Sequence, residues 1–270
     1  MVFILLVLGV TFGSFVNALV WRLRQQELHP KSRQKYSIST GRSMCSRCKE
    51  PLAVKDLIPV ISWIWLQGKC RYCHKPIEDT PLPEIVTAIL FVISYIFWPN
   101  RINGTEIVLF GAWLSLLVGF VALGLYDFKW TLLPNRILFW MIPAVILQNV
   151  VLLATSSDKG TLCINLLISI LVGGGVFWLL FQVSEGKWIG GGDVKLGFLV
   201  GAILGSPLLS FLWIFVASLL GTFVSLPQLL LGNSKIKSRI PFGPYLIASV
   251  IVVKLFGKQM VHWYFNQLGL

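Results

Sequence analysis

The sequence has few charged residues: Asp, Glu, Lys and Arg make up only 13% of its 270 positions. Soluble globular domains normally carry about 25% charged residues, so this scarcity excludes an ordinary soluble domain. Negative charge is the scarcer sign, with 11 Asp and Glu against 23 Lys and Arg. Apolar residues dominate instead, because 56% of the chain is hydrophobic and 11 residues are Trp. The composition therefore predicts a polytopic membrane protein.

Eight apolar runs are candidates for crossing a membrane, which takes about 20 apolar residues for a hydrocarbon core of roughly 30 Å. The second, sixth and eighth runs are short, so we expect each to be half-buried, re-entrant or extended by flanking residues. Only Gly205-Ser206-Pro207 separates the sixth run from the seventh, and without that break the count would be seven. We predict an all-α polytopic fold with about eight transmembrane helices. The runs cover residues 1–21, 84–98, 106–126, 134–154, 162–183, 194–205, 207–231 and 241–257.

The chain has no basic stretch before its first apolar run, whereas Arg22 and Arg24 follow that run. This order is the reverse of a cleavable signal peptide, so we predict a retained span with the N-terminus outside. If the spans alternate, 19 of the 23 Lys and Arg lie on one side, 12 of them in the loop 22–83. Such an excess marks the cytoplasmic side. The net charge of +12 is thus interpreted as a topology signal, with affinity for anionic membrane lipid rather than for nucleic acid. The other basic residues on that side are Lys129, Arg136, Lys187, Lys195, Lys235, Lys237 and Arg239.

Cysteine is also scarce, but four of the five cysteines form two CxxC pairs in the polar loop 22–83. Cys45 and Cys48 form the first pair, Cys70 and Cys73 form the second, and 21 residues separate the two pairs. Four thiolates with this spacing are typical of a structural zinc site. A loop of about 60 residues has too small a core to fold easily alone, so a metal would supply stability. We therefore predict a small cytoplasmic loop domain that binds a metal through its four cysteines.

Two alternatives stay open for these cysteines. The four thiols are free or redox-active in the first alternative, although a reducing cytoplasm disfavours disulfides. In the second, His74, which adjoins the last cysteine, replaces one thiolate as a ligand. A solvent-facing loop histidine is the simpler interpretation of His74, and the zinc interpretation needs only the four cysteines.

Two carboxylates lie at the ends of apolar runs, where an ionisable group indicates a functional site. Asp127 ends the third run, and Asp193 follows Gly190-Gly191-Gly192 and opens the sixth. Glycine lets the backbone approach a partner closely or adopt a positive φ. A glycine cluster alone favours tight helix packing, which is what we predict for Gly173-Gly174-Gly175. Together, the two acids at the cytoplasmic edge predict a two-carboxylate site.

These motifs, taken in order, resemble those of a known family. The chain is similar, nearly end to end, to the prepilin peptidases (type IV leader peptidases), a branch of the intramembrane aspartyl proteases with a Gly-x-Gly-Asp signature. Any one motif is weak, whereas the ordered set is specific. The motifs are Gly13-Ser14-Phe15-Val16-Asn17, the two CxxC pairs, Asp56-Leu57-Ile58-Pro59, Pro83-Glu84, Asp127 with Leu133-Pro134-Asn135, Gly190-Gly191-Gly192-Asp193, and Pro241-Phe242-Gly243-Pro244.

The resemblance implies an enzyme of a bacterial cytoplasmic membrane that cleaves the basic leader from type IV prepilin, pseudopilin or competence-type precursors. It assigns Asp127 and Asp193 as catalytic residues, with Gly190 and Gly192 supporting them. It also implies N-methylation of the new N-terminus from S-adenosylmethionine. In that case residues 1–105 would form the methyltransferase part and residues 106–270 the peptidase domain. The sequence has no recognisable methyltransferase fold or glycine-rich cofactor loop, so no residue is assigned to that cofactor.

The electrostatics of helix ends predict different roles for the two acids. The start of a helix favours an ionised Asp193, whereas the end of a helix disfavours ionisation of Asp127. Closely spaced carboxylates cannot easily ionise together. We therefore predict that Asp193 is the general base and Asp127 the general acid in the resting state.

Two other function classes remain as alternatives. A transporter or channel uses paired intramembrane acids as a proton or cation relay, and the cysteine loop would then be regulatory. Such a protein is expected to show inverted repeats or corresponding broken helices in its two halves, and this sequence shows no such symmetry. The other alternative is a methyltransferase or assembly scaffold whose protease half has decayed. Retention of both acids in their motifs argues against it.

Overall fold

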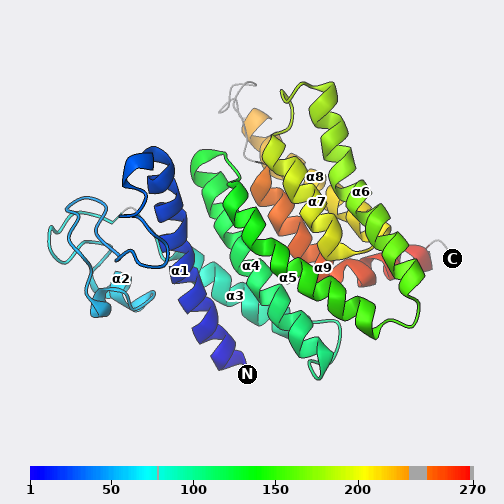
Figure 1. Ribbon diagram of the computed structural model, residues 1–270, viewed down its shortest axis with the longest axis horizontal. Helices are drawn as coiled ribbons and strands as arrows, with labels where there is room; N and C mark the ends of the chain where they lie inside the picture. Colours follow the sequence, from blue (N-terminus) through cyan, green and yellow to red (C-terminus); the bar gives the residue numbers. More distant parts are fainter. Residues whose placement is uncertain (78, 231–241, 268–270) are drawn as a thin grey trace. The chain divides into compact units, whose positions relative to one another are not determined.

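The computed structural model describes residues 1–77, 79–230 and 242–267 (Figure 1). In this part, the chain divides into two compact units, Met1–Ile96 and Phe97–Leu270. Apart from two isolated β-bridges, the regular structure of the described residues is helical. Four residues that carried sequence predictions lie outside the described ones, namely Lys235, Lys237, Arg239 and Pro241.

Among the described residues, eight helices of 14 residues or more account for the eight apolar runs, so the predicted all-α fold is confirmed. Six are long and apolar enough to cross a membrane, and α3 and α7 are shorter. Gly205 ends α7 in the left-handed conformation at φ 63°, so the sixth and seventh runs form separate helices. Flanking residues extend the eighth run into a helix of 25 residues. The helices are α1 (Val2–Leu28), α3 (Leu82–Ile96), α4 (Thr105–Trp130), α5 (Asn135–Thr155), α6 (Lys159–Val183), α7 (Gly191–Leu204), α8 (Pro207–Leu230) and α9 (Gly243–Gln267).

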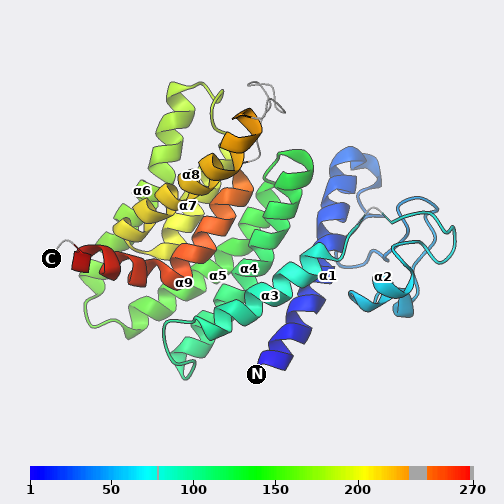
Figure 2. The ribbon, with the colours of Figure 1, turned by 180° about the vertical axis from the view of Figure 1, so that it is seen from behind.

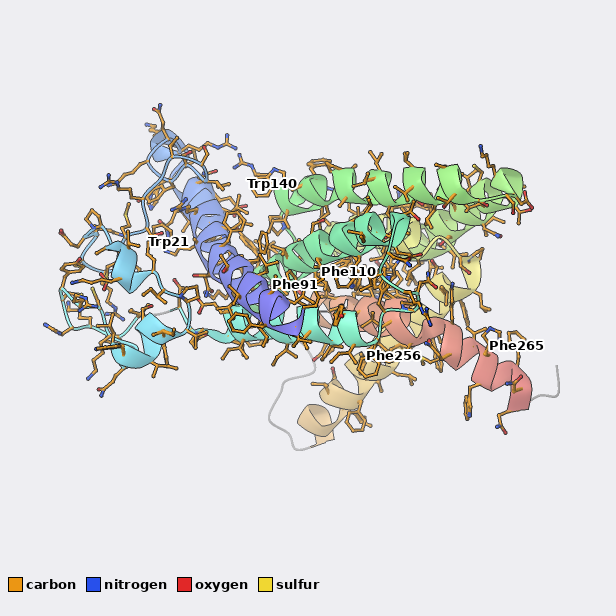
Figure 3. The ribbon with its side chains drawn as sticks, turned by 90° about the horizontal axis from the view of Figure 1, so that it is seen from below. Trp21, Phe91, Phe110, Trp140, Phe256 and Phe265 are labelled. Carbon is orange, nitrogen blue, oxygen red and sulfur yellow. The ribbon has the colours of Figure 1, made fainter. Side chains whose placement is uncertain are left out.

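The first unit is built on close packing of α1 against α3. Gly9 and Gly13 of α1 touch the backbone of α3 at Ala88 and Glu84, and a Cβ at either glycine would overlap that backbone. Small residues allow membrane helices to approach in this way. Phe91 of α3 is buried on this pair of helices (Figure 3). The polar loop therefore leaves the end of α1 and returns to the middle of α1, where α3 begins.

The polar loop is anchored to α1 by Arg22. Its guanidinium donates to the carbonyl oxygens of Ser37, Ile38 and Gly41 at 3.2, 2.9 and 2.9 Å. Arg22 is only 9% exposed, so the charge is satisfied by main-chain acceptors rather than by water. The loop also contains two 3₁₀ turns, η1 (Pro30–Ser32) and η2 (Val54–Asp56), and the short helix α2 (Ile61–Trp65).

The second unit packs α4 against α5 and α9, and α6 against α7 and α8 (Figures 1 and 2). The buried face of α4 carries large side chains, among which Trp113, Phe120 and Tyr126 are fully buried. By contrast, Trp140 of α5 lies on the outer side of its helix and is half exposed (Figure 3). Such an exposed aromatic side chain suits a lipid-facing surface.

Glycines determine how closely α6 approaches α7. A Cβ at Gly197 of α7 would lie 2.5 Å from the carbonyl oxygen of Gly173 on α6, and one at Gly174 would overlap the ring of Phe198. The predicted packing role is therefore confirmed for Gly173 and Gly174. It is wrong for Gly175, because that residue faces open space, where an added Cβ would have no neighbour within 4 Å.

Candidate functional site

Asp127 lies in the last turn of α4 and is only 6% exposed. Its Oδ2 accepts a hydrogen bond of 3.1 Å from the main-chain N–H of Gly243, the first residue of α9. A Cβ on Gly243 would lie 2.6 Å from the same oxygen, so only glycine fits against this carboxyl group. The start of α9, with its partial positive charge, thus faces Asp127.

Asp193 lies in the first turn of α7, where its Oδ2 accepts the main-chain N–H of Gly190 at 3.3 Å. This is half of a capping box, in which an acidic side chain satisfies a free donor at the helix start. Asp127 and Asp193 interact electrostatically, so the fold brings together two carboxyl groups that are 66 positions apart in the sequence. Asp127, in the last turn of α4, and Asp193, in the first turn of α7, thus lie within electrostatic reach of each other, and their catalytic roles stay a prediction.

The connection between α4 and α5 holds the start of α7. A Cβ on Gly192 would lie 2.7 Å from the Cβ of Leu133. A second contact joins the same two segments, because Lys195 Nζ of α7 donates to Asn135 Oδ1 at the start of α5 at 2.8 Å. Gly190, Gly191 and Gly192 are not among the glycines with positive φ. Close approach to Leu133, rather than a left-handed backbone, is thus the reason for glycine at 192.

We expect Gly192→Ala to reduce activity at this site at least about tenfold, because an overpacked contact costs about 1–3 kcal/mol and here it displaces the turn that carries Asp193. Gly191→Ala is the matched control, since its added Cβ would have no neighbour closer than 3.8 Å. Turnover of both purified variants is compared with the wild type at equal protein concentration. Equal turnover of the two variants would contradict the steric role of Leu133.

A pocket of about 380 Å³ opens between α8 and the start of α9. Phe242 and Tyr245, which flank the Gly243–Pro244 start of α9, line one side. Ser218 and Thr222 of α8 line the other, and their hydroxyls donate to main-chain carbonyls one turn earlier. These hydroxyls are therefore satisfied within α8, so the pocket that they line is largely apolar. The remaining lining residues are Gly221, Ser225 and Leu226.

The four predicted metal ligands come together in the first unit. The sulfur atoms of Cys45, Cys48, Cys70 and Cys73 all lie within 4.8 Å of one another. The Cys45–Cys73 and Cys48–Cys70 sulfur pairs are each 4.0 Å apart. Tetrahedral zinc with bonds of about 2.3 Å needs sulfur atoms about 3.8 Å apart, so small side-chain movements would close the site. The cluster could therefore hold a metal ion.

The two CxxC segments have the same backbone construction. In the first, the Cys45 N–H donates to the Glu50 carbonyl, and in the second the Cys70 N–H donates to the Lys75 carbonyl, at 3.0 and 2.9 Å. Lys49 and His74, each directly after the second cysteine of its pair, are left-handed with φ of 61° and 56°. His74 thus occupies the turn position that Lys49 occupies in the other segment, while Cys73 supplies the sulfur to the cluster.

Asp56 ties the second CxxC segment to η2. Its side chain is 2% exposed and its Oδ1 accepts from Arg71 Nε at 2.6 Å. Burial alone would raise the pKa of Asp56, but hydrogen bonds from Arg71 and the Ala53 N–H, with the charges of Arg71 and Lys55, hold the pKa below its ordinary value. The ionised carboxylate therefore stabilises the loop.

We expect Asp56→Asn to speed amide hydrogen exchange in the loop by about tenfold or more at pH 5–7, because hydrogen bonds to charged groups contribute about 1.5–3 kcal/mol. The lowered pKa makes this contribution complete above about pH 4, the ordinary pKa of Asp, and it is lost as the pH falls through the folded-state pKa. The difference from wild type should therefore narrow below about pH 4. Glu50→Gln, which changes an exposed acid in the same loop, should show no such pattern. A pH-independent difference would rule out the ion pair as its cause.

Glu84 ties the loop to α1 and α3. Its carboxylate accepts the Val60 N–H at 2.5 Å and also interacts with the Ser14 hydroxyl. Val60 has a φ of 60°, which is a costly conformation for a β-branched residue. Asn17 Nδ2 donates to the Thr80 carbonyl at 3.1 Å. These polar residues of the α1–α3 pair therefore make structural hydrogen bonds.

Sequence comparisons connect both units with known proteins. The profile of the bacterial peptidase A24 N-terminal domain matches residues 7–98, and that of the type IV leader peptidase family matches residues 114–226. A prepilin leader peptidase/N-methyltransferase of Aeromonas hydrophila is 30% identical, with 95% of this chain and 91% of the relative covered. Proteins with the same name from Pseudomonas aeruginosa (30% identity; 98% and 93% covered) and Bacillus subtilis (29%; 98% and 98%) are similarly related. No solved structure shows a significant match. The chain therefore belongs to the type IV leader peptidase family.

Proposed function

We propose that this protein is an intramembrane aspartic endopeptidase that removes the leader from type IV prepilin-like precursors, and that it also N-methylates the new N-terminus. The observation that carries the peptidase proposal is the pairing of Asp127 and Asp193 across the ends of α4 and α7, where their carboxyl groups interact. Family membership supports the same activity and does not favour the transporter or channel alternative.

The two aspartates would share the work of peptide hydrolysis. One carboxylate is ionised and accepts a proton from the attacking water, while the protonated partner donates a hydrogen bond to the scissile carbonyl. The water oxygen bonds to the carbonyl carbon, and the C–N bond then breaks as the leaving nitrogen takes a proton from a carboxyl group. The products are a carboxylate and a free amine. Each aspartate accepts one main-chain N–H, so these hydrogen bonds do not distinguish the base from the acid. The assignment of Asp193 as base and Asp127 as acid stays a prediction, which titration of the two carboxyl groups would test.

Glycine and backbone groups position the two acids in this proposal. Gly192 allows α7 to approach Leu133, and Gly190 supplies the N–H that Asp193 accepts. Gly243 belongs to the Pro241-Phe242-Gly243-Pro244 motif, and its N–H donates to the Asp127 carboxyl group. The pocket lined by Phe242 and Tyr245, which flank the Gly243 that binds Asp127, offers apolar space for a substrate side chain.

The proposed substrate follows from the proposed orientation in the membrane. The excess of Lys and Arg favours a cytoplasmic position for the polar loop and for the ends of α4 and α7 that carry the acids. The N-terminus of α1 would then lie outside. A precursor that inserts its apolar segment as a membrane helix leaves its basic leader on the cytoplasmic side. The carboxyl groups of Asp127 and Asp193 would then lie at the junction between the basic leader and the apolar segment of the precursor.

The methyltransferase part is proposed for residues 1–105 and the peptidase domain for residues 106–270. The four cysteines would hold a structural zinc, because thiolates in two CxxC pairs suit that ion. S-adenosylmethionine would supply the methyl group. The polar groups of the α1–α3 pair, such as Glu84, are engaged with Val60 and Ser14, and they do not form a recognisable site for this cofactor. We assign no residue to it.

Mass spectrometry of a co-expressed pilin-like precursor tests both activities. Leader removal is expected in cells that contain the wild-type protein and not in cells without it. A further mass increment of one methylene on the new N-terminus is expected for the methyltransferase. Absence of cleavage with several prepilin-like precursors would overturn the peptidase proposal, and cleavage without the increment would overturn the methyltransferase proposal.

A further inference from the structure

The helix that carries Asp193 is too short to cross a membrane. α7 has 14 residues and is therefore about 21 Å long, against a hydrocarbon core of roughly 30 Å. The last four carbonyl groups of a helix have no partner within it, and in a hydrocarbon core each unsatisfied group costs several kcal/mol. The Gly205 N–H pairs with the Gly201 carbonyl. The carbonyls that follow need other donors.

Three side chains from two neighbouring helices supply these donors. Gln148 Nε2 of α5 donates to the Ile203 carbonyl at 2.8 Å, and Asn149 Nδ2 donates to the Ala202 carbonyl at 3.0 Å. Lys254 Nζ of α9 donates to the same Ile203 carbonyl at 3.2 Å and to Gln148 Oε1 at 3.3 Å. Gln148 is only 2% exposed. We call Gln148, Asn149 and Lys254 the α7 clamp.

The charge of Lys254 suits this place. The C-terminal end of a helix carries a partial negative charge, which an ammonium group stabilises. Glu106 and Lys258 are the ionisable groups whose charges act on Lys254. The carboxylate of Glu106 accepts hydrogen bonds from Trp98 Nε1 at 3.0 Å and Asn100 Nδ2 at 2.8 Å. The described hydrogen bonds of Lys254 thus go to the end of α7 and to Gln148 rather than to an acid.

The clamp acts at the opposite end of α7 from Asp193. At the Asp193 end, Gly192 contacts Leu133 and Lys195 binds Asn135. Between the ends, α7 packs closely on α6 through Gly197 and Gly201, and Ser169 of α6 donates to the Gly201 carbonyl at 2.7 Å. The clamp adds hydrogen bonds to the carbonyls that follow Gly201, at the last turn of α7.

We propose that the α7 clamp sets the axial position of α7 and thereby the separation of Asp193 from Asp127. Gln148, Asn149 and Lys254 are positioning residues, because they act on the reacting groups only through α7. The importance of that separation for cleavage rests on the proposed function, whereas the separation itself is measurable without any substrate. In Lys254→Met the charged donor is lost and α7 is free to shift, whereas Lys254→Arg keeps a cation that can reach the Ile203 carbonyl.

Chemical cross-linking measures the separation directly. Asp127→Cys and Asp193→Cys are combined in a Cys163→Ser background and treated with bis-methanethiosulfonate reagents of graded length, and linked peptides are identified by mass spectrometry. We expect Lys254→Met to change the length of the shortest reagent that cross-links the two cysteines. In Lys254→Arg that length should return to its value with Lys254. Lys258→Met, the same substitution one turn along α9 at an exposed position, is the matched control. An Asp127→Cys, Leu132→Cys pair, in which Leu132 is an exposed residue just after α4, should link equally in all variants.

Kinetics on the intact aspartates supply the second measurement. Lys254→Met should lower kcat for leader cleavage about tenfold with little change in KM, as expected when a group acts on the transition state rather than on substrate binding. Lys254→Arg should recover most of that loss. Asn149→Ala, which removes one neutral donor, is a milder variant to be used if Lys254→Met does not accumulate. It should shift the cross-linking pattern in the same direction by less.

The outcomes separate this inference from the proposed function. An unchanged cross-linking pattern in both Lys254→Met and Asn149→Ala would overturn the clamp, whatever the enzyme does. A changed pattern in a protein that never cleaves a prepilin-like precursor would support the clamp and overturn the peptidase proposal. A fall in kcat that Lys254→Arg does not recover would contradict a role for the cation and overturn the inference for Lys254.

Discussion

Asp127→Asn and Asp193→Asn are each expected to lower leader cleavage by about 10³-fold or more. General acid and base groups contribute about 10²–10⁴-fold each, and in this pair the loss of one carboxyl group removes the proton partner of the other. The double variant should be no less active than either single variant, because residues that act as a unit show non-additive losses. Single-turnover cleavage of a purified prepilin-like precursor in detergent measures all three.

The control for this experiment lies in the polar loop. Glu50 is an exposed acid of the other unit, so Glu50→Gln makes a similar change of charge away from the proposed site. It should leave cleavage within a factor of about two, as for most surface changes. Equal abundance of the variants in membranes excludes misfolding as the cause of a loss. Cleavage that persists in both aspartate variants would favour the relay or scaffold alternatives.

Cys45→Ser combined with Cys70→Ser is expected to remove one bound zinc per chain and unfold the polar loop. The double change takes one sulfur from each CxxC segment, and structural zinc contributes about 10–16 kcal/mol of apparent binding free energy in small domains. The loop lacks a large apolar core of its own, because residues such as Ile61, Ile64 and Trp65 are exposed. Elemental analysis measures the zinc, and amide hydrogen exchange over residues 45–73 measures the unfolding.

Cys163→Ser is the matched control for the metal site, since the same substitution is made on α6 outside the cluster. It should keep both the zinc and the protection of the loop. Leader cleavage by the double cysteine variant should fall much less than methylation, because the aspartates lie in the other unit. Zinc retained in full by the double variant would contradict the four-cysteine site.

Much of the fold was predictable from the sequence because its determinants are local. The lengths of the six longest apolar helices match the thickness of the hydrocarbon core, and the Gly205–Pro207 break ends one helix and starts the next. The CxxC spacing likewise brings two sulfurs of one pair together within a single turn. For the same reason both aspartates could be placed at helix ends without knowledge of their partners. The error at Gly175 has the same origin, since a run of three glycines does not say which of them faces α7.

The partners of these residues were decided by the packing of helices that are distant in the sequence. Nothing near Asp127 indicates that the N–H of Gly243, 116 positions away, points at its carboxyl group. In the sequence, Lys254 is one of 23 Lys and Arg with no distinguishing feature. In the structure, its Nζ donates to the Ile203 carbonyl at the C-terminal end of α7. Composition and apolar-run length decide that a segment is a membrane helix, because water and hydrocarbon act on each segment separately. Which helix ends meet depends on how side chains of all the helices fit together, and that fit exists only in the folded chain.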